Sequence, residues 1–330
     1  MLRTEYAFEQ KGGFGMVRKL LRSVREYKTS SLLAPLFVTC EVILEVIIPM
    51  LMANLIDFGI EAGNMQYILK MGLALIICCI VSLTFGALSG KYAAVASAGF
   101  AKNLREDMYN KVQEYSFSNI DKFSTASIVT RLTTDITNIQ NAYMMSIRVA
   151  VRCPIMLIFA LFMAFQINSH LAPIFVIAIP ILAVGLVIII SNAKRIFERV
   201  FRTYDKLNNV VQENLHGIRV VKSFVREDHE TEKFCSVSKE IYQDFSKAEK
   251  ILAFNAPLMQ FCAYGCMLLI SWLGAKLIVA SGNNPAVGMT TGDLTSMFSY
   301  TMQILMSLMM FSMVFLSLIH ISEPTRRSYI

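Results

Sequence analysis

Charge is scarce in this sequence. Only 17% of its 330 residues are Asp, Glu, Lys or Arg, and 55% are hydrophobic, whereas an average soluble domain carries roughly 25% charged residues. The mean hydropathy is +0.52. A soluble core of this length does not need so much apolar surface, so the composition argues against an ordinary soluble protein and favours one that lies in a membrane.

Sequence patterns of catalytic, metal and nucleotide sites are also missing. The seven cysteines have no metal-finger spacing and most stand in apolar runs, which indicates packing. The histidines are scattered, and no Ser-His-Asp set is recognisable. No G-x-x-x-x-G-K-[ST] loop occurs, because the cluster at residues 12–15 lacks the lysine and precedes no strand. The N-terminus has no apolar stretch that would make a cleavable signal peptide. We therefore expect no catalytic, cofactor or metal site in this chain.

Six long apolar runs dominate the sequence instead. A membrane-spanning helix needs about 20 mostly apolar residues. Such runs occupy residues 32–58, 68–89, 147–167, 171–191, 251–280 and 294–319. The predicted fold class is therefore an all-α membrane protein with six transmembrane helices. It comprises a tail (1–31), a transmembrane domain (32–319) and an atypical C-terminal segment (320–330).

The direction of these spans follows from lysine and arginine. The three short links between spans carry none, whereas the N-terminal tail carries seven, residues 90–135 carry six and residues 192–250 carry twelve. Because basic residues collect on the cytosolic side, we expect the N-terminus and both long links to be cytosolic in a multi-pass protein of the plasma membrane. This placement accounts for the net charge of +7 without a nucleic-acid partner.

Residues 13–28 have an apolar arc opposite a basic one. Val17, Leu20, Leu21 and Val24 share the apolar arc. The pattern predicts an interfacial helix along the inner leaflet. The alternative is an amphipathic helix packed on protein.

The two long links keep helical periodicity and have few glycines or prolines. We expect each membrane helix to continue into the cytosol, turn at a tip and return as a helical hairpin. Residues 119–125 and the His216-Gly217 step mark the two tips. A stiff hairpin of this kind can transmit force to a soluble partner.

The residues at the two tips resemble a known family. The second hairpin reads QENLHGIRVVKSFVREDHETEKF over residues 212–234, and the first reads NIDKFSTASIVTRLTTDI over residues 119–136. They resemble the second and first intracellular loops of bacterial ABC exporters of the multidrug and lipid half-transporter type. Pro49 followed by LIDFG at residues 55–59 fits the outer end of the family's first helix. The resemblance covers about residues 20–315.

The resemblance implies a dimer of two transporter halves, identical or different, that exports a drug, lipid or peptide by alternating access. It implies ATP and Mg²⁺ on an ATPase domain outside this chain, and coupling helices near residues 119–127 and 212–220. The coupling residues that it implies are Asn119, Asp121, Lys122, Ser124, Thr125, Glu213, Asn214, Leu215, Gly217, Ile218 and Arg219.

From His320 the sequence departs from this family, and Pro324 is expected to interrupt the sixth helix. We expect either a truncated or out-of-frame coding end, or a stand-alone membrane subunit whose ATPase is a separate chain.

Ionisable residues within spans are candidates for function because they are costly there. Glu41 and Glu45 share one face of the first span, and Arg148 and Arg152 open the third. One hypothesis places the glutamates in a central substrate cavity, in contact with cationic or amphipathic cargo. The other pairs them with a basic or polar group on a neighbouring helix, and it lets the arginines extend to the membrane interface.

Methionines are frequent in the last spans, and Met302 and Met306 are candidates for the same cavity because thioethers suit varied apolar ligands. Lipid-facing or packing filler is the alternative. An ion-coupled secondary transporter that uses Glu41 and Glu45 is the alternative function, although such a carrier has no use for two stalks with coupling tips.

Overall fold

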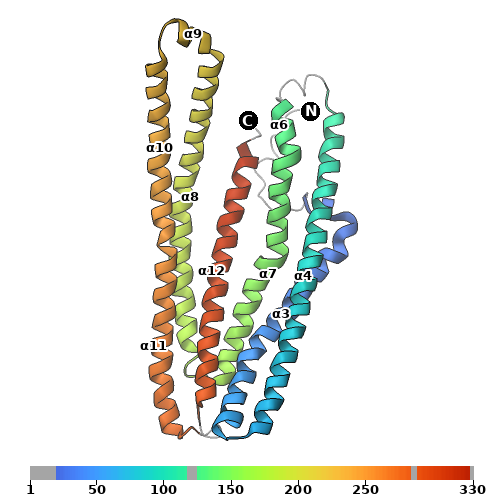
Figure 1. Ribbon diagram of the computed structural model, residues 1–330, viewed down its shortest axis with the longest axis vertical. Helices are drawn as coiled ribbons and strands as arrows, with labels where there is room; N and C mark the ends of the chain where they lie inside the picture. The colour runs from blue at the N-terminus through green and yellow to red at the C-terminus, as the bar shows by residue number, and fades with distance from the viewer. Residues whose placement is uncertain (1–19, 117–124, 284–287, 328–330) are drawn as a thin grey trace, which may run out of the picture. The chain divides into compact units, whose positions relative to one another are not determined.

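The computed structural model describes residues 20–116, 125–283 and 288–327, which form helices joined by turns and contain no strand. They fall into two compact units. Unit 1 holds the chain up to Pro173 and again from Leu269, and unit 2 holds Ile174–Leu268. Figure 1 shows the helices in chain order by colour.

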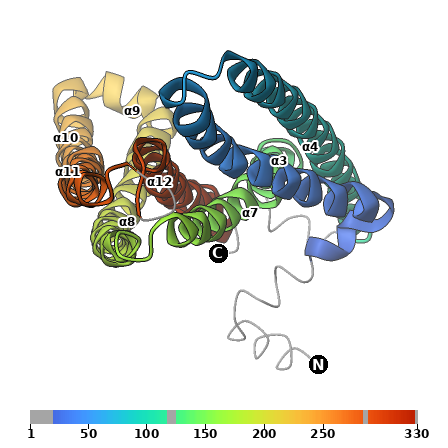
Figure 2. The ribbon, with the colours of Figure 1, turned by 90° about the horizontal axis from the view of Figure 1, so that it is seen from below.

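Unit 1 is built around four long helices. α3 (Lys28–Leu55) and α4 (Met65–Gln113) pack along each other, and α7 (Ile136–Ile167) packs against both. α12 (Thr291–Arg327) packs on α7 and α3, and Figure 2 shows α3 beside α4 from below. The shorter elements are η1 (Arg22–Tyr27), η2 (Ile56–Glu61), α6 (Thr125–Thr130) and η3 (Arg131–Asp135).

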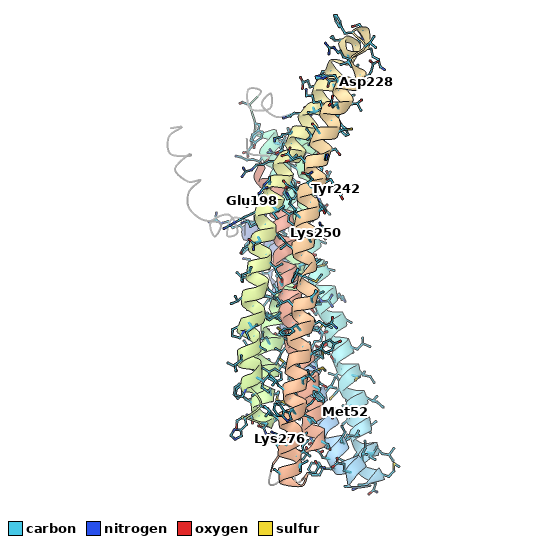
Figure 3. All side chains as sticks on the ribbon, turned by 90° about the vertical axis from the view of Figure 1, so that its left-hand side faces the viewer. Met52, Glu198, Asp228, Tyr242, Lys250 and Lys276 are labelled. Carbon is cyan, nitrogen blue, oxygen red and sulfur yellow. The ribbon has the colours of Figure 1, made fainter. Side chains whose placement is uncertain are left out.

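Unit 2 is one long helical hairpin. Its elements are α8 (Pro173–His216), α9 (Ile218–Ser223), α10 (Glu227–Ala253) and the first part of α11 (Asn255–Ser281). Ala193 and Phe197 of α8 pack on Ala248 of α10, and ion pairs such as Arg199–Asp244 flank this apolar seam. In Figure 3, Asp228 lies near the tip, with Tyr242 and Lys250 successively farther along α10.

Six helical stretches among the described residues are long and apolar enough to cross a membrane, as the sequence predicts. They are Arg22–Glu61, Met65–Gln113, Ser127–Ile167, Pro173–His216, Glu227–Ser281 and Thr291–Val314. Two of them run far beyond their apolar part without a break, because α4 has 49 residues and α8 has 44. The prediction that membrane helices continue directly into the hairpins is confirmed for both.

Pro49 opens the backbone of α3 to contacts from α12. A proline has no N–H to donate to the carbonyl four residues earlier, which here is that of Glu45. Gln303 of α12 donates its Nε2 to this carbonyl at 3.3 Å. Two hydroxyls of α12 make similar contacts one and two turns before Gln303. Tyr300 donates to the Val46 carbonyl at 2.8 Å, and Ser296 donates to the Pro49 carbonyl at 2.7 Å. These three contacts form a junction between α3 and α12 around the proline.

Pro324 does not end the sixth helix, so that expectation was wrong. α12 continues through Pro324 to Arg327. Ending a helix leaves its last carbonyls without partners, whereas a proline removes a single backbone hydrogen bond and adds one clash. Pro35, Pro154 and Pro180 likewise lie inside helices.

The segment before α3 departs from the single helix expected over residues 13–28. η1 is a 3₁₀ helix, and Arg25 within it has a φ of 39°. Val24 is buried in a cluster with Phe100 and Leu104 of α4, and Ser23 and Arg25 both donate to Asp107. The described part therefore packs on protein, which is the alternative considered above. Residues 13–19 lie outside the described residues, so the interfacial position stays a prediction.

Candidate functional site

A polar triad joins α3 to α7 within their apolar parts. Arg152 of α7 donates Nη1 to Glu41 Oε1 at 2.7 Å and Nη2 to both oxygens of Glu45 at 2.6 Å. The side chains are 27% exposed for Arg152 and Glu45 and 12% exposed for Glu41. The four-residue spacing of the glutamates places them on one face, so a single guanidinium reaches both. The hypothesis that they pair with a basic group on a neighbouring helix is confirmed; their contact with cargo stays a prediction.

Small residues of α4 let this triad sit close to the helix. A Cβ added at Gly86 would lie 3.1 Å from Glu41 Oε1, and one at Gly90 would lie 3.7 Å from Arg148 Nη1. Ser89 between them is fully buried. Small residues of this kind let two helices approach each other closely within a membrane.

Three buried oxygens near this level have no hydrogen-bond partner among the described residues: Glu41 Oε2, Ser89 Oγ and Gln303 Oε1. Because buried polar groups are usually paired, these oxygens need an explanation. Met302 and Met306, the other cavity candidates, are 40% and 55% exposed on α12.

A second polar cluster lies at the end of unit 1 that holds residues 62–64 and 288–290. This end is called the short-link end below. Asp57 accepts from Gly292 N at 2.9 Å and from Thr290 Oγ1 at 2.6 Å. Glu61 accepts from Thr291 Oγ1 and Asn283 Nδ2. Thr290 and Asp293 also exchange side-chain to backbone hydrogen bonds, as in a capping box at the start of α12.

Gly292 is required by this second cluster. A Cβ at this position would lie 2.5 Å from the Ala53 carbonyl oxygen and 2.6 Å from Asp57 Oδ2. The backbone of α12 therefore approaches α3 more closely than any side chain allows. In the sequence, Asp57 stands out only as part of the LIDFG run at residues 55–59. The signal for its partners is the Thr-Thr-Gly-Asp run at residues 290–293.

The tip of unit 2 has a short helix, as expected, but it lies later in the chain. Gln212–His216 are the last turn of α8, and α9 spans Ile218–Ser223 instead of residues 212–220. Gly217 separates the two helices, and its N–H donates to the Glu213 carbonyl at 2.9 Å. Periodicity continues up to the glycine, so only the glycine itself marks where the first helix ends.

Apolar side chains on this tip are open to solvent. Leu215, Val220, Phe224 and Val225 are between 60% and 80% exposed. A groove of about 310 Å³ lies beside them, lined in part by Val211, Leu215, Ile218 and Phe234.

Charged and polar side chains connect the two helices at the base of this tip. Lys233 donates to Glu213 at 2.7 Å and Asn214 to Glu230 at 3.3 Å. The hydrogen bond from Lys233 lowers the pKa of the Glu213 carboxyl. Arg219, like Ile218, belongs to α9. All of the residues assigned to the second tip therefore lie on α8, Gly217 or α9.

The first hairpin tip falls largely outside the described residues. Asn119, Asp121, Lys122 and Ser124 belong to that part of the sequence, and Thr125 is the first residue of α6. α4 ends at Gln113 and the next described helix begins at Thr125. The coupling role of this tip stays a prediction.

Comparison with known proteins agrees with this architecture. The family model described as "ABC transporter transmembrane region" matches residues 31–318. An uncharacterised ABC transporter ATP-binding protein, YfiB, of Bacillus subtilis is 28% identical over 295 residues, which cover 89% of this chain and 50% of that protein. An ATP-dependent lipid A-core flippase of Pseudoalteromonas translucida is 22% identical over 257 residues, covering 78% and 44%.

The chain belongs to the family of ABC transporter transmembrane regions and is a transmembrane domain of the ABC exporter type. An uncharacterised ABC transporter ATP-binding protein of Mycobacterium tuberculosis is 27% identical over 306 residues, covering 90% of this chain and 50% of that protein. The chain thus spans about half the length of the curated relatives that it matches.

Proposed function

We propose that this chain is the membrane half of an exporter that moves an amphipathic or hydrophobic substrate out of the cytosol by alternating access. ATP and Mg²⁺ bind to an ATPase domain that is not among these residues. The lysine and arginine distribution supports a cytosolic N-terminus and cytosolic hairpins. The substrate class includes lipids, since one relative is named a lipid A-core flippase.

The observation that carries this proposal is the tip of unit 2. An exposed short helix, α9, stands at the end of a hairpin whose helices continue from membrane spans. Its exposed apolar residues are costly in water unless a partner covers them. The packed seam and ion pairs make the hairpin stiff enough to carry a displacement from its tip. The names of the relatives, which are ATP-binding proteins, support an ATPase as this partner.

Transport by this scheme needs two halves, and we propose that a second copy or a related chain supplies the other one. Exposed apolar residues on the spans, such as Leu268 and Trp272 of α11, support contact with lipid or with that second half. Met302 and Met306 would then provide a deformable apolar surface for the substrate.

Co-expression with a candidate ATPase chain tests the coupling. Phe224→Asp, which places a charge on the most accessible aromatic ring of the tip, should abolish co-purification and substrate-stimulated ATP hydrolysis. Tyr242→Asp is the matched control, because Tyr242 is equally exposed, at 71% against 73%, but lies farther along α10 from the tip. Unchanged ATP hydrolysis in the Phe224 variant would exclude α9 as the coupling helix.

A further inference from the structure

The α3–α7 triad has more acceptors than donors. Two carboxylates share the single guanidinium of Arg152, so the triad has one more acidic than basic group. Both oxygens of Glu45 and one of Glu41 accept from Arg152. The other, Glu41 Oε2, is buried and meets no donor within the described part of the chain.

Ser89 is a second buried polar group without a partner among the described residues. Its side chain is fully buried and its Oγ has no partner among the described residues. A serine inside a helix usually bonds a backbone carbonyl one turn earlier, as Ser97 of the same helix does with Ala94. Ser89 leaves that bond unmade and shares the face of α4 that carries Gly86 and Gly90, which contact Glu41 and Arg148. Its hydroxyl therefore lies on the face of α4 that packs against Glu41 and Arg148.

Arg148 does not complete the charge balance. It lies one turn before Arg152 on α7, is exposed, and makes no ion pair with either glutamate in the described structure. Its guanidinium lies against Gly90 instead. Glu41 Oε2 therefore has no donor among the described residues, and a group with both positive charge and hydrogen-bond donors would complement it.

We propose that Glu41 and Ser89 bind a protonated amine or guanidinium group of the transported substrate, and that Arg152 is the positioning residue that holds the two glutamates. The proposal rests on the transport function above and narrows its substrate to amphipathic cations with N–H donors. An ammonium presents only donors, and both the unpaired oxygen of Glu41 and the hydroxyl oxygen of Ser89 can accept from it. Charge-assisted hydrogen bonds of this kind are among the stronger ones.

Equilibrium binding to the purified full chain in nanodiscs tests this site. The probes are decylammonium, which has N–H donors, and decyltrimethylammonium, which has the same charge and chain but none; empty nanodiscs correct for uptake by lipid. The wild-type chain should bind decylammonium about tenfold more tightly or better. Glu41→Gln should remove this preference, and Ser89→Ala should weaken decylammonium binding several-fold. Glu61→Gln is the matched control, because it removes a carboxylate of the second polar cluster, and binding should stay unchanged.

Equal binding of the two probes by the wild-type chain, or unchanged decylammonium binding by a folded Glu41→Gln variant, would overturn the proposal and leave the triad as a connection between helices. Circular dichroism establishes that each variant is folded. ATP hydrolysis in the complex with an ATPase chain separates this outcome from failure of the transport function. If ATP hydrolysis is coupled but the preference for N–H donors is absent, only the cation site is excluded. If the preference is present but ATP hydrolysis is not coupled, only the transport function is excluded.

Discussion

The first span and its continuation η2 carry two polar clusters that differ in how completely they are satisfied. At the short-link end, all four carboxylate oxygens of Asp57 and Glu61 accept a hydrogen bond. In the middle of the helix, Glu41 keeps one buried oxygen without a donor among the described residues. A fully satisfied cluster needs nothing further and serves to join α3 to α12. A cluster with an unpaired buried oxygen, such as Glu41 Oε2, can accept a further hydrogen bond from a bound group.

The two clusters also use different donors. Asp57 and Glu61 accept from hydroxyls, an amide and a backbone N–H, whereas Glu41 and Glu45 depend on one guanidinium. Loss of a neutral donor removes one modest hydrogen bond. Loss of a guanidinium leaves two unpaired charges in an apolar segment, which is far more costly.

Arg152→Met should therefore have the largest effect on stability. Removing one partner of a buried ion pair costs about 3–5 kcal/mol, and here two carboxylates lose the same cation. The free energy of unfolding, from titration with SDS followed by circular dichroism, measures the loss. Arg148→Met is the matched control one turn away, and it should change stability by less than about 0.5 kcal/mol because Arg148 makes no ion pair in the described structure.

A triple variant sharpens the comparison. Glu41→Gln, Glu45→Gln and Arg152→Met together remove all three charges, so most of the lost stability should return. If the triple variant is as unstable as Arg152→Met alone, unpaired charge is not the cause.

Gly292→Ala should have the next largest effect, at the second cluster. The added Cβ would meet the Ala53 carbonyl and Asp57 at distances that backbone atoms cannot accept, and such overpacking costs about 1–3 kcal/mol. Gly72→Ala is the control, because nothing lies within 4 Å of the added Cβ there. That variant should gain about 0.5–1 kcal/mol from helix propensity. Equal effects of the two variants would show that α12 does not approach α3 so closely.

Features of this structure that depend on residues close together in the chain could be predicted from the sequence, whereas those that depend on distant residues could not. The six spans and the continuous hairpin helices could be predicted because apolar length and periodicity are local properties. Gly217, which directly follows the last residue of α8, is likewise a local signal. The partner of Glu41 and Glu45 could not be identified in advance, because it depends on which helices become neighbours.

The second cluster shows the same limit more clearly. Asp57 lies more than 230 residues from Thr290 and Gly292 in the chain, so no local pattern connects them. The error at Pro324 has a different origin. A proline inside a helix costs about 3 kcal/mol locally, but a helix that continues past it keeps backbone hydrogen bonds that an earlier end would lose.

A double-mutant cycle at Pro49 and Gln303 examines the junction that lies between the two clusters. Gln303→Leu should cost about 0.5–1.5 kcal/mol, because the Glu45 carbonyl loses its only side-chain donor in the described structure. In a Pro49→Ala background the restored backbone N–H can serve that carbonyl, so Gln303→Leu should cost less. SDS titration of the four variants gives the coupling free energy. A value of zero would mean that the missing proline N–H does not explain the contact.

Glu61→Gln should have the smallest effect on stability. It tests the cluster in which every carboxylate oxygen accepts a hydrogen bond. Glu61 is exposed, and glutamine keeps one acceptor oxygen for Thr291 or Asn283. Exposed charges contribute little because solvent screens them, so the free energy of unfolding should change by less than about 0.5 kcal/mol. The same isosteric change at Glu41 removes one of two carboxylates that compete for Arg152, and its main consequence should appear in ligand binding. If Glu61→Gln destabilises the chain as strongly as Gly292→Ala, the charge of Glu61 holds the cluster together, and the distinction between neutral and ionic donors fails.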